Sequence, residues 1–134
     1  MPLRAHDWFR QAEADLRHAR HAQDDGDFEW ACFAAQQAAE KATKAVYEAH
    51  HLEGWGHTIS SLLGNLPDFL KAPEDLISKA KGLDKHYVPA RYPNGFASGA
   101  PTDFYTTADA IQAIEYAAAI LHFCRTHLPA PPGS

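Results

Sequence analysis

Apolar residues recur at helical spacing along most of this chain. The first helix is expected over about residues 5–25, with a buried stripe of Trp8, Ala12, Leu16 and Ala19 at intervals of four, four and three. A turn is expected at residues 24–27, where two aspartates precede a glycine. Asp27 then stands at the N-cap position of a second helix.

The second helix is expected over about residues 28–51. Alanine dominates its inner face, and small side chains allow a neighbouring helix to approach closely. A third helical segment is expected in two pieces, at about residues 58–66 and 74–87, with prolines between them. The alanines of the predicted seam are Ala31, Ala34, Ala38, Ala42 and Ala45.

Residues 88–106 predict an irregular stretch because they contain three prolines and two glycines. Thr106 or Thr107 is expected to cap a last helix that runs to about residue 127. Its predicted buried stripe is Ala110, Ile111, Ile114, Ala117 or Ala118, Leu121 and Cys124.

No segment alternates polar and apolar residues in the manner of a strand. The pattern therefore predicts an all-α fold, an up-and-down bundle of four or five helices. We expect a single helical domain at residues 1–128 and a flexible proline-rich tail at residues 129–134.

The formal net charge of −5 argues against nonspecific binding of duplex DNA through a uniformly basic surface, although a local basic pocket remains compatible with it. The two cysteines, Cys32 and Cys124, lie in apolar helical stretches, which predicts buried free thiols. No apolar run is long enough to span a bilayer, and the first residues do not resemble a signal peptide. We therefore expect a cytoplasmic protein without membrane contact.

The alanine-rich second helix also carries a polar face. Gln37, Lys41 and Lys44 stand at i, i+4 and i+7 and so share one side of the helix. Glu40 and Lys44 form an i,i+4 pair in the favourable order. This face forms either the wall of a binding site or a solvated ion pair of little energetic value.

A second candidate region is the loop that follows Asp84. Two prolines restrict it, so it can hold Arg91 and Tyr92 at fixed positions. The guanidinium of Arg91 can bind a phosphate or carboxylate through two hydrogen bonds, and Tyr87 and Tyr92 offer stacking faces. The alternative is that Arg91 only ties down its own loop, by bonding backbone carbonyls or Asp84.

His57 follows a glycine at the start of the third helical segment. It would lie near Lys44 or the Arg91 loop in a bundle of the expected kind. Its alternative role is a hydrogen bond at the start of the helix.

Nine histidines require that a metal site be considered. Asp15 and His18, and likewise Glu48 and His51, have the i,i+3 spacing found in dimetal bundles. Such a site also needs a carboxylate from each of the other two helices, and only Glu115 on the last helix offers one. We therefore expect neither a metal nor another cofactor.

Four segments together resemble the HEPN domain family: FAAQQAAEKATKAVYEAH, GHTISSLL, LDKHYVPARYPNG and FYTTADAIQAIEYAAAILHF. The resemblance covers about residues 5–123. It implies a four- or five-helix bundle that is commonly a homodimer and that deals with nucleotides or RNA. Many small members of the family act beside a separately encoded minimal nucleotidyltransferase as a toxin–antitoxin-like pair.

The ribonuclease members of that family carry an arginine, a gap of four to six residues and a histidine. After Arg91 the corresponding positions hold Phe96, Ala97 and Ser98, and no other arginine of the chain has a histidine at the required distance. Since RNA cleavage without a metal needs an acid or base that titrates near neutrality, the departure leaves enzymatic activity in doubt.

Three hypotheses follow. The first is a dimeric module that binds a nucleotide or a nucleotidyltransferase partner without turnover. The second is a ribonuclease toxin with a non-standard catalytic set around Arg91, and the third is a scaffold whose polar face is only solvated.

Trp30, Phe33 and Phe104 are the expected apolar contacts of a dimer. The candidate ligand- or partner-binding residues are Gln37, Lys41, Lys44, His57, Asp84, Tyr87, Arg91 and Tyr92.

Overall fold

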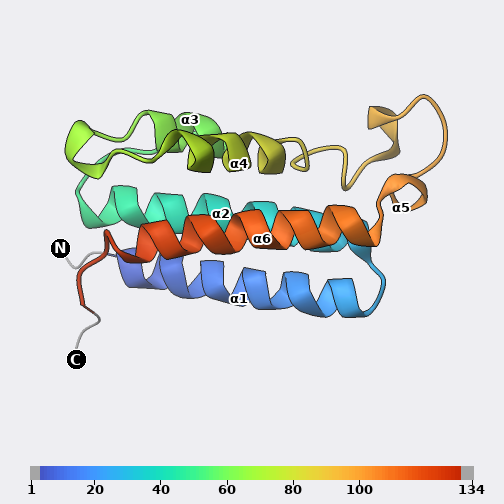
Figure 1. Cartoon of the computed structure of the whole chain (residues 1–134), viewed down its shortest axis with the longest axis horizontal. Helices are drawn as coiled ribbons and strands as arrows, with labels where there is room; N and C mark the ends of the chain where they lie inside the picture. Colours follow the sequence, from blue (N-terminus) through green and yellow to red (C-terminus); the bar gives the residue numbers. More distant parts are fainter. Residues whose placement is uncertain (1–3, 131–134) are drawn as a thin grey trace.

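The computed structural model describes residues 4–130, and all regular secondary structure within this range is helical (Figure 1). The all-α bundle predicted from the sequence is confirmed. Two short 3₁₀ turns, Asp68–Leu70 and Pro93–Gly95, lie in the connections. The helices are α1 (Ala5–Asp24), α2 (Phe28–Ala49), α3 (Ile59–Gly64), α4 (Glu74–Asp84), α5 (Pro101–Phe104) and α6 (Thr107–Arg125).

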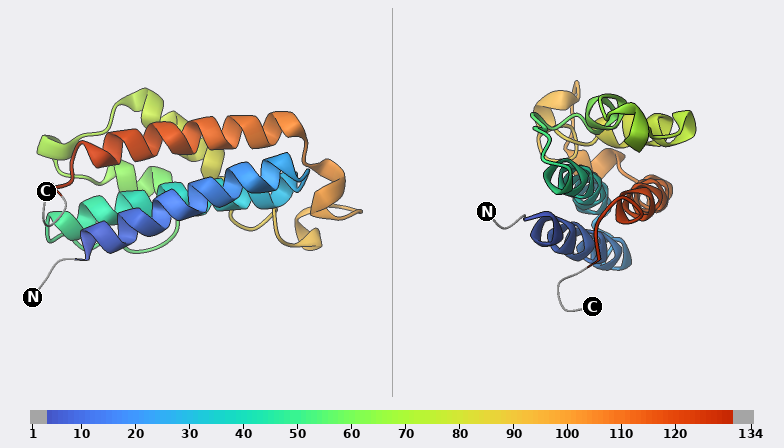
Figure 2. Two further views of the ribbon diagram at one scale, coloured as in Figure 1. Left: turned by 90° about the horizontal axis from the view of Figure 1, so that it is seen from below. Right: turned by 90° about the vertical axis from the view of Figure 1, so that its left-hand side faces the viewer.

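The four longer helices alternate in direction, so that α1 begins and α6 ends at the same end of the bundle (Figure 1). Helix α2 lies at the centre and packs against α1, α6, α3 and α4 (Figure 2). Helices α3 and α4 cover the side of α2 and α6 that lies away from α1 (Figure 2). Every site that involves α2 is therefore close to several other elements.

The alanine seam of α2 forms the closest-packed part of the core. All five predicted alanines are buried, and Ala35 and Ala39 beside them are fully buried as well. Because an alanine side chain is a single methyl group, α1 and α6 can approach the backbone of α2 closely. The dense contact that results leaves little room for a larger side chain.

The predicted buried stripe of α1 is wrong at one residue. Trp8 is 37% exposed, whereas Phe9 is 6% exposed and packs in the core. The observed stripe begins at Ala5 and returns at Phe9, Ala12 and Leu16, so Trp8 lies one residue out of phase. Its indole faces solvent at the edge of the helix.

Helix α6 shows one similar deviation. Ile111 is 42% exposed, and Ala113 occupies the core in its place. Of the two alternatives proposed for the middle of the stripe, Ala117 is buried and Ala118 is half-buried. The predicted cap is confirmed at Thr106, whose hydroxyl accepts a hydrogen bond from the backbone N–H of Asp109.

Several boundaries differ from the predicted ones. Helix α2 ends at Ala49, because His51 adopts a left-handed conformation with φ of 56°. Helix α4 ends at Asp84, three residues before the predicted end at Tyr87. Asp27 occupies the N-cap position of α2 as expected, but its side chain makes no capping hydrogen bond.

Both cysteines are buried and free, as predicted. Across residues 4–130, none of the helices has the length and apolar character needed to cross a membrane. Residues 131–134 of the predicted tail and residues 1–3, used in the signal-peptide argument, lie outside the described range.

The packing of the alanine seam can be tested with the substitution Ala42→Leu. Extra methylene groups at this fully buried position should lower the free energy of unfolding by about 1–3 kcal/mol, since a close-packed core must shift to accept them. The matched control is Ala108→Leu at an exposed position of α6, with an expected change within about 0.5 kcal/mol. Urea denaturation followed by circular dichroism measures both, and equal midpoints for the two variants would refute the close packing.

Candidate functional site

The carboxylate of Glu40 is the centre of the polar cluster on α2. Its side chain is only 6% exposed. Lys44 Nζ donates to Glu40 Oε2 at 3.1 Å, and Gln36 Nε2 donates to Oε1 at 3.2 Å. His57 Nδ1 lies 3.0 Å from Glu40 Oε2. A carboxylate with this little solvent is stable only because these partners replace its lost hydration.

His57 links this cluster to the loop after α4. Its ring stacks on the ring of Tyr87, with centroids 4.7 Å apart and planes within 17°. The side chain remains 55% exposed, so one edge of the imidazole faces solvent. His57 thus lies beside both Lys44, through Glu40, and the loop that carries Arg91.

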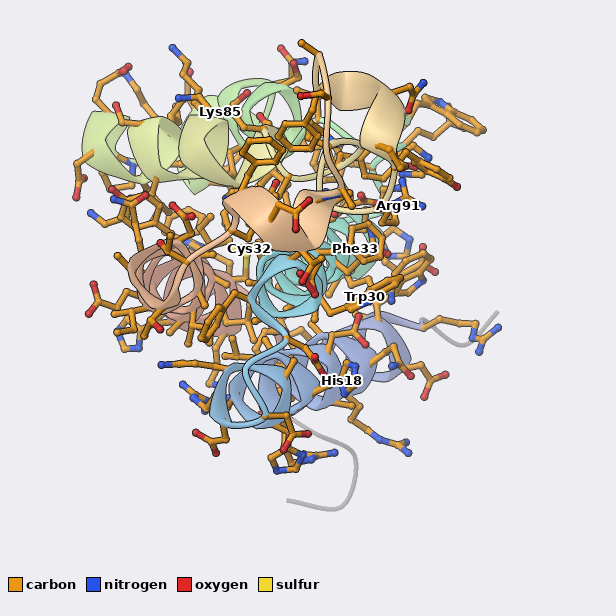
Figure 3. The ribbon with its side chains drawn as sticks, turned by 90° about the vertical axis from the view of Figure 1, so that its right-hand side faces the viewer. His18, Trp30, Cys32, Phe33, Lys85 and Arg91 are labelled. Carbon is orange, nitrogen blue, oxygen red and sulfur yellow. The ribbon has the colours of Figure 1, made fainter. Side chains whose placement is uncertain are left out.

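Arg91 lies among aromatic rings, next to Phe33 (Figure 3). The central carbon of its guanidinium is 4.3 Å from the ring centre of Phe33, 4.9 Å from that of Tyr87 and 5.3 Å from that of Tyr92. These distances are within the range of cation–π attraction. Arg91 therefore has a defined position on the surface.

Arg91 also binds its own loop. Its Nε and Nη2 donate to the backbone carbonyl of Tyr87 at 3.0 and 2.6 Å. This is the loop-fixing interaction considered in the sequence analysis, and it involves the carbonyl rather than Asp84. The guanidinium is half-buried, so a ligand would meet an arginine that is already oriented.

Asp84 holds the start of α3. Its Oδ1 accepts from the backbone N–H of Ile59 at 2.7 Å, and its Oδ2 accepts from the N–H and the hydroxyl of Ser60 at 3.2 and 2.6 Å. A carboxylate at a helix N-terminus satisfies N–H groups that have no partner within the helix. Asp84 rather than His57 therefore makes the hydrogen bonds at this helix start.

The three residues of the predicted polar face do not all meet in one place. Lys44 joins Glu40, whereas Lys41 points to α1 and donates to Asp15 at 2.6 Å. Gln37 donates to Gln36 Oε1 at 2.8 Å and so supports the cluster indirectly. The ion pair of Lys41 places this residue nearer to the surface of α1 than to Arg91.

Tyr92 is 50% exposed, and its ring is available as a stacking surface. A small cavity of about 260 Å³ lies between the start of α3 and the loop after α4. Its lining residues are His57, Thr58, Asp84, Tyr87, Val88 and Pro89. Three of the eight predicted site residues therefore surround one cavity.

The eight predicted site residues left out three residues of this site. Glu40, which the sequence offered only as the ion-pair partner of Lys44, is its centre. Gln36 is fully buried and donates to Glu40, and Phe33 supports Arg91. The signal for Gln36 was its position four residues before Glu40, which places both side chains on one helix face. Phe33 could not be found in this way, because its partner lies 58 residues further along the chain.

Burial controls the titration of several groups away from the site. It raises the pKa of Cys32 to about 12, and also that of Cys124 to about 12. Burial lowers the pKa of His86, whose Nδ1 lies 3.0 Å from the hydroxyl of Tyr105. Thiols with such pKa values are poor nucleophiles at neutral pH.

Among residues 4–130, no group of three or more histidine, cysteine, aspartate or glutamate side chains is placed to hold a metal ion.

Comparison with known families matches residues 5–127 to the model of the HEPN domain. The chain belongs to the HEPN domain family. The match covers both halves of the site, the polar face of α2 and the loop with Arg91. The resemblance inferred from the four sequence segments is thus confirmed.

Solved HEPN-like structures share this fold. The protein is 46% identical to TT1696 from Thermus thermophilus, with a TM-score of 0.92, over 95% of this chain and 100% of that one. It is 42% identical to ST0689, an archaeal HEPN homologue, with a TM-score of 0.80, over 94% and 98% of the two chains. An HEPN domain protein from Thermotoga maritima is 36% identical with a TM-score of 0.73, over 90% and 95%.

One relative has a name that bears on function. The protein named "Putative toxin MJ1304", from Methanocaldococcus jannaschii, is 26% identical over 130 residues, which are 90% of this chain and 86% of that protein. The name thus gives a toxin role to that relative.

Removal of the Asp84 carboxylate should weaken the start of α3. We expect Asp84→Ala to lower the free energy of unfolding by about 1–2 kcal/mol, the usual cost of losing a capping side chain. The control is Asp75→Ala, which removes an exposed i,i+4 pair with Lys79 and should cost less than about 0.5 kcal/mol. Thermal denaturation of both variants provides the comparison, and a loss at Asp84 no larger than that at Asp75 would contradict the assignment.

The two thiols should be unreactive in the native protein. At pH 8 we expect a chromogenic disulfide reagent to modify neither cysteine, because burial leaves each thiol protonated. Both should react once urea unfolds the chain. Rapid modification of either thiol without urea would show that its surroundings open readily to solvent.

Proposed function

We propose that this HEPN protein is a binding module that recognises a nucleotide, a minimal nucleotidyltransferase partner, or both, within a toxin–antitoxin-like two-component system. The observation that carries the proposal is the meeting of His57 and Arg91 at Tyr87, next to the Glu40–Lys44 pair. Family membership and the toxin name of a relative support the system to which it would belong. The predicted cytoplasmic location is part of the same proposal.

The site has the chemistry that a nucleotide requires. Tyr92 offers an exposed ring on which a base can stack, and Arg91 and Lys44 offer cationic groups for phosphates. Arg91 is already oriented by Phe33 and by the carbonyl of Tyr87, which reduces the entropy lost on binding. A carboxylate on a partner protein would meet the same groups.

The proposal includes a homodimer. Trp30 and Phe104 are each 49% exposed, and the ring of Phe33 lies beside Trp30 at 6.2 Å. Trp30 and Phe33 lie on the same side of the bundle as Arg91 (Figure 3). Exposed aromatic residues of this kind are enriched at protein interfaces. Trp30, Phe33 and Phe104 are therefore the expected apolar contacts between the two copies.

A ribonuclease toxin is the second candidate. The specific observation in its favour is that His57 and Arg91, from separate parts of the chain, both lie against the ring of Tyr87. Such a pair could supply the acid–base group that is missing from the usual arginine–histidine spacing. This candidate predicts turnover, whereas the binding module does not.

The binding proposal can be tested by affinity purification of the tagged protein from lysate of its native cells, with mass spectrometry of the bound proteins. We expect a small nucleotidyltransferase in near-equal amount with the wild-type protein, and a loss of at least about tenfold with Arg91→Ala, which removes a central charged anchor. Lys71→Ala, an exposed change on another face, is the control and should retain the partner. Absence of any such partner, together with no binding of nucleotides to the isolated protein, would contradict the proposal.

The ribonuclease candidate requires a separate assay. Purified protein would be incubated with labelled RNA, and Arg91→Ala and His57→Ala would be compared with the wild type. Cleavage that falls by about a hundredfold or more in both variants would identify an enzyme with a non-standard catalytic pair. Cleavage that is unchanged in the variants would mark a contaminating nuclease.

A further inference from the structure

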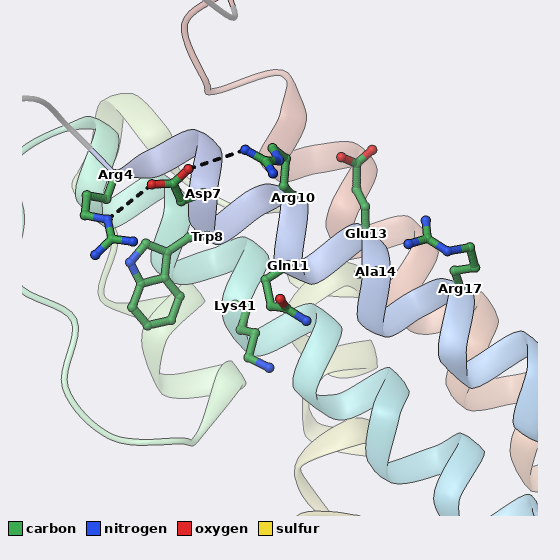
Figure 4. Close-up of a pocket in the computed structure, with 9 residues that line it drawn as sticks. All are labelled: Arg4, Asp7, Trp8, Arg10, Gln11, Glu13, Ala14, Arg17 and Lys41. Carbon is green, nitrogen blue, oxygen red and sulfur yellow. Dashed lines mark hydrogen bonds and ion pairs between the residues drawn. The ribbon is translucent and has the colours of Figure 1, made fainter.

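Most of the arginines of this chain are gathered around α1. Five of its six arginines, together with Lys41, line two shallow grooves along α1, and the sixth is Arg91. The first groove, of about 760 Å³, covers the outer surface of α1 and its edge with α2 (Figure 4). The second, of about 460 Å³, lies between α1 and α6. We call the combined surface the arginine strip; its cationic residues are Arg4, Arg10, Arg17, Arg20, Lys41 and Arg125.

The two grooves lie on either side of Glu13 and Arg17, which line both of them. From Arg4 to Arg20 the strip spans about 24 Å, at a helical rise of about 1.5 Å per residue. A ligand on it would therefore be extended, and longer than a single nucleotide.

The charge of the strip differs from that of the whole protein. The strip holds half of the twelve lysines and arginines, but only Asp7 and Glu13 of the seventeen acidic residues line it. The chain as a whole has a formal charge of −5. A local cationic surface on an acidic protein directs anions to one place.

Some of these cations have acidic neighbours within the protein. Arg4 and Arg10 both approach Asp7, at 3.2 and 3.7 Å, and Arg125 donates to Glu13 at 2.7 Å. These three pairs are exposed, and exposed pairs contribute little, so an anionic ligand can replace them. Lys41 differs, because its 2.6 Å pair with Asp15 is partly buried and is retained.

The centre of the strip has no such neighbours. Within residues 4–130, neither Arg17 nor Arg20 forms an ion pair with an acidic side chain. Both side chains are exposed.

Trp8 adds a stacking surface to the first groove. Its indole is 37% exposed and lies on the same face as Arg4 and Lys41 (Figure 4). Proteins that bind single-stranded nucleic acid combine a cationic groove with aromatic rings on which bases stack. The use of arginine rather than lysine suits phosphates, since the guanidinium forms two parallel hydrogen bonds with them.

We propose that the arginine strip binds a single-stranded nucleic acid, with phosphates on Arg10, Arg17 and Arg20 and a base stacked on Trp8. An acidic protein segment would be attracted by the charges but would make no use of the exposed indole. This site is separate from the cluster around Arg91, and the proposal does not depend on the function proposed for that cluster.

The test is fluorescence anisotropy with a labelled single-stranded RNA of twelve mixed-sequence nucleotides, at about 50 mM salt, where backbone contacts are strong. The test variant is the double substitution Arg17→Glu, Arg20→Glu. Its matched control, Lys71→Glu, Lys81→Glu, changes the net charge equally at two exposed positions outside the strip. Circular dichroism confirms that both variants fold.

We expect the strip variant to bind the RNA at least about tenfold more weakly than the wild type, and the control to change by less than about threefold. The slope of log K against log salt should fall by about 1.4 in the strip variant, which is the value for two lost phosphate contacts on a single strand. Trp8→Leu should weaken binding by about fivefold or more through lost stacking.

Three results would overturn the proposal. The first is equal loss in the strip variant and its charge-matched control, which would show an effect of net charge alone. The second is retention of RNA binding in the strip variant with its loss in Arg91→Ala, which would place the RNA at the other site. The third is equal affinity for a poly-glutamate peptide of the same length, which would identify the strip as a surface for acidic proteins.

Discussion

The close contact between α2 and its neighbours is the constraint on which the rest of this structure depends. Alanines on one side of α2 allow α1 and α6 to pack against its backbone. With α2 enclosed in this way, its remaining polar residues have few directions in which to point. Gln36 and Glu40 lie at the boundary between this core and the surface, and both are buried.

The buried carboxylate of Glu40 connects the core to the candidate site. It requires compensation, and it receives it from Lys44 on its own helix and His57 on the following connection. His57 in turn supports Tyr87, whose carbonyl orients Arg91. A chain of contacts therefore runs from the packed interior to the half-buried Arg91, and each member restricts the next.

Asp84 stabilises the same region from the other side. It joins the end of α4 to the start of α3, and both segments line the cavity beside Tyr87. The site is thus assembled from three stretches of sequence that are far apart along the chain. This arrangement suits recognition by a pre-organised surface rather than by a loop that folds on binding.

Helix periodicity predicted the fold and most of the core because apolar residues that recur every three or four positions mark the buried face of a helix. It failed at Trp8 and Ile111, which periodicity placed in the core and which lie one or two residues away from an apolar neighbour that packs better. For the candidate site, helix spacing identified Lys44. Residue type, together with a neighbouring glycine and two prolines, identified His57 and Arg91. The role of Asp84 at the start of α3 depends on how two helices meet, and spacing within one helix contains no information about that.

We expect the groups around Tyr87 to form a binding site for a nucleotide or a partner that presents similar anionic groups. The most direct measurement is a nuclear magnetic resonance titration of isotope-labelled protein with ATP, with the backbone assigned. We expect saturable shifts at Lys44, His57, Arg91 and Tyr92, and their loss in Arg91→Ala. Shifts confined to other regions, or unchanged in that variant, would contradict a nucleotide site at this place in the fold.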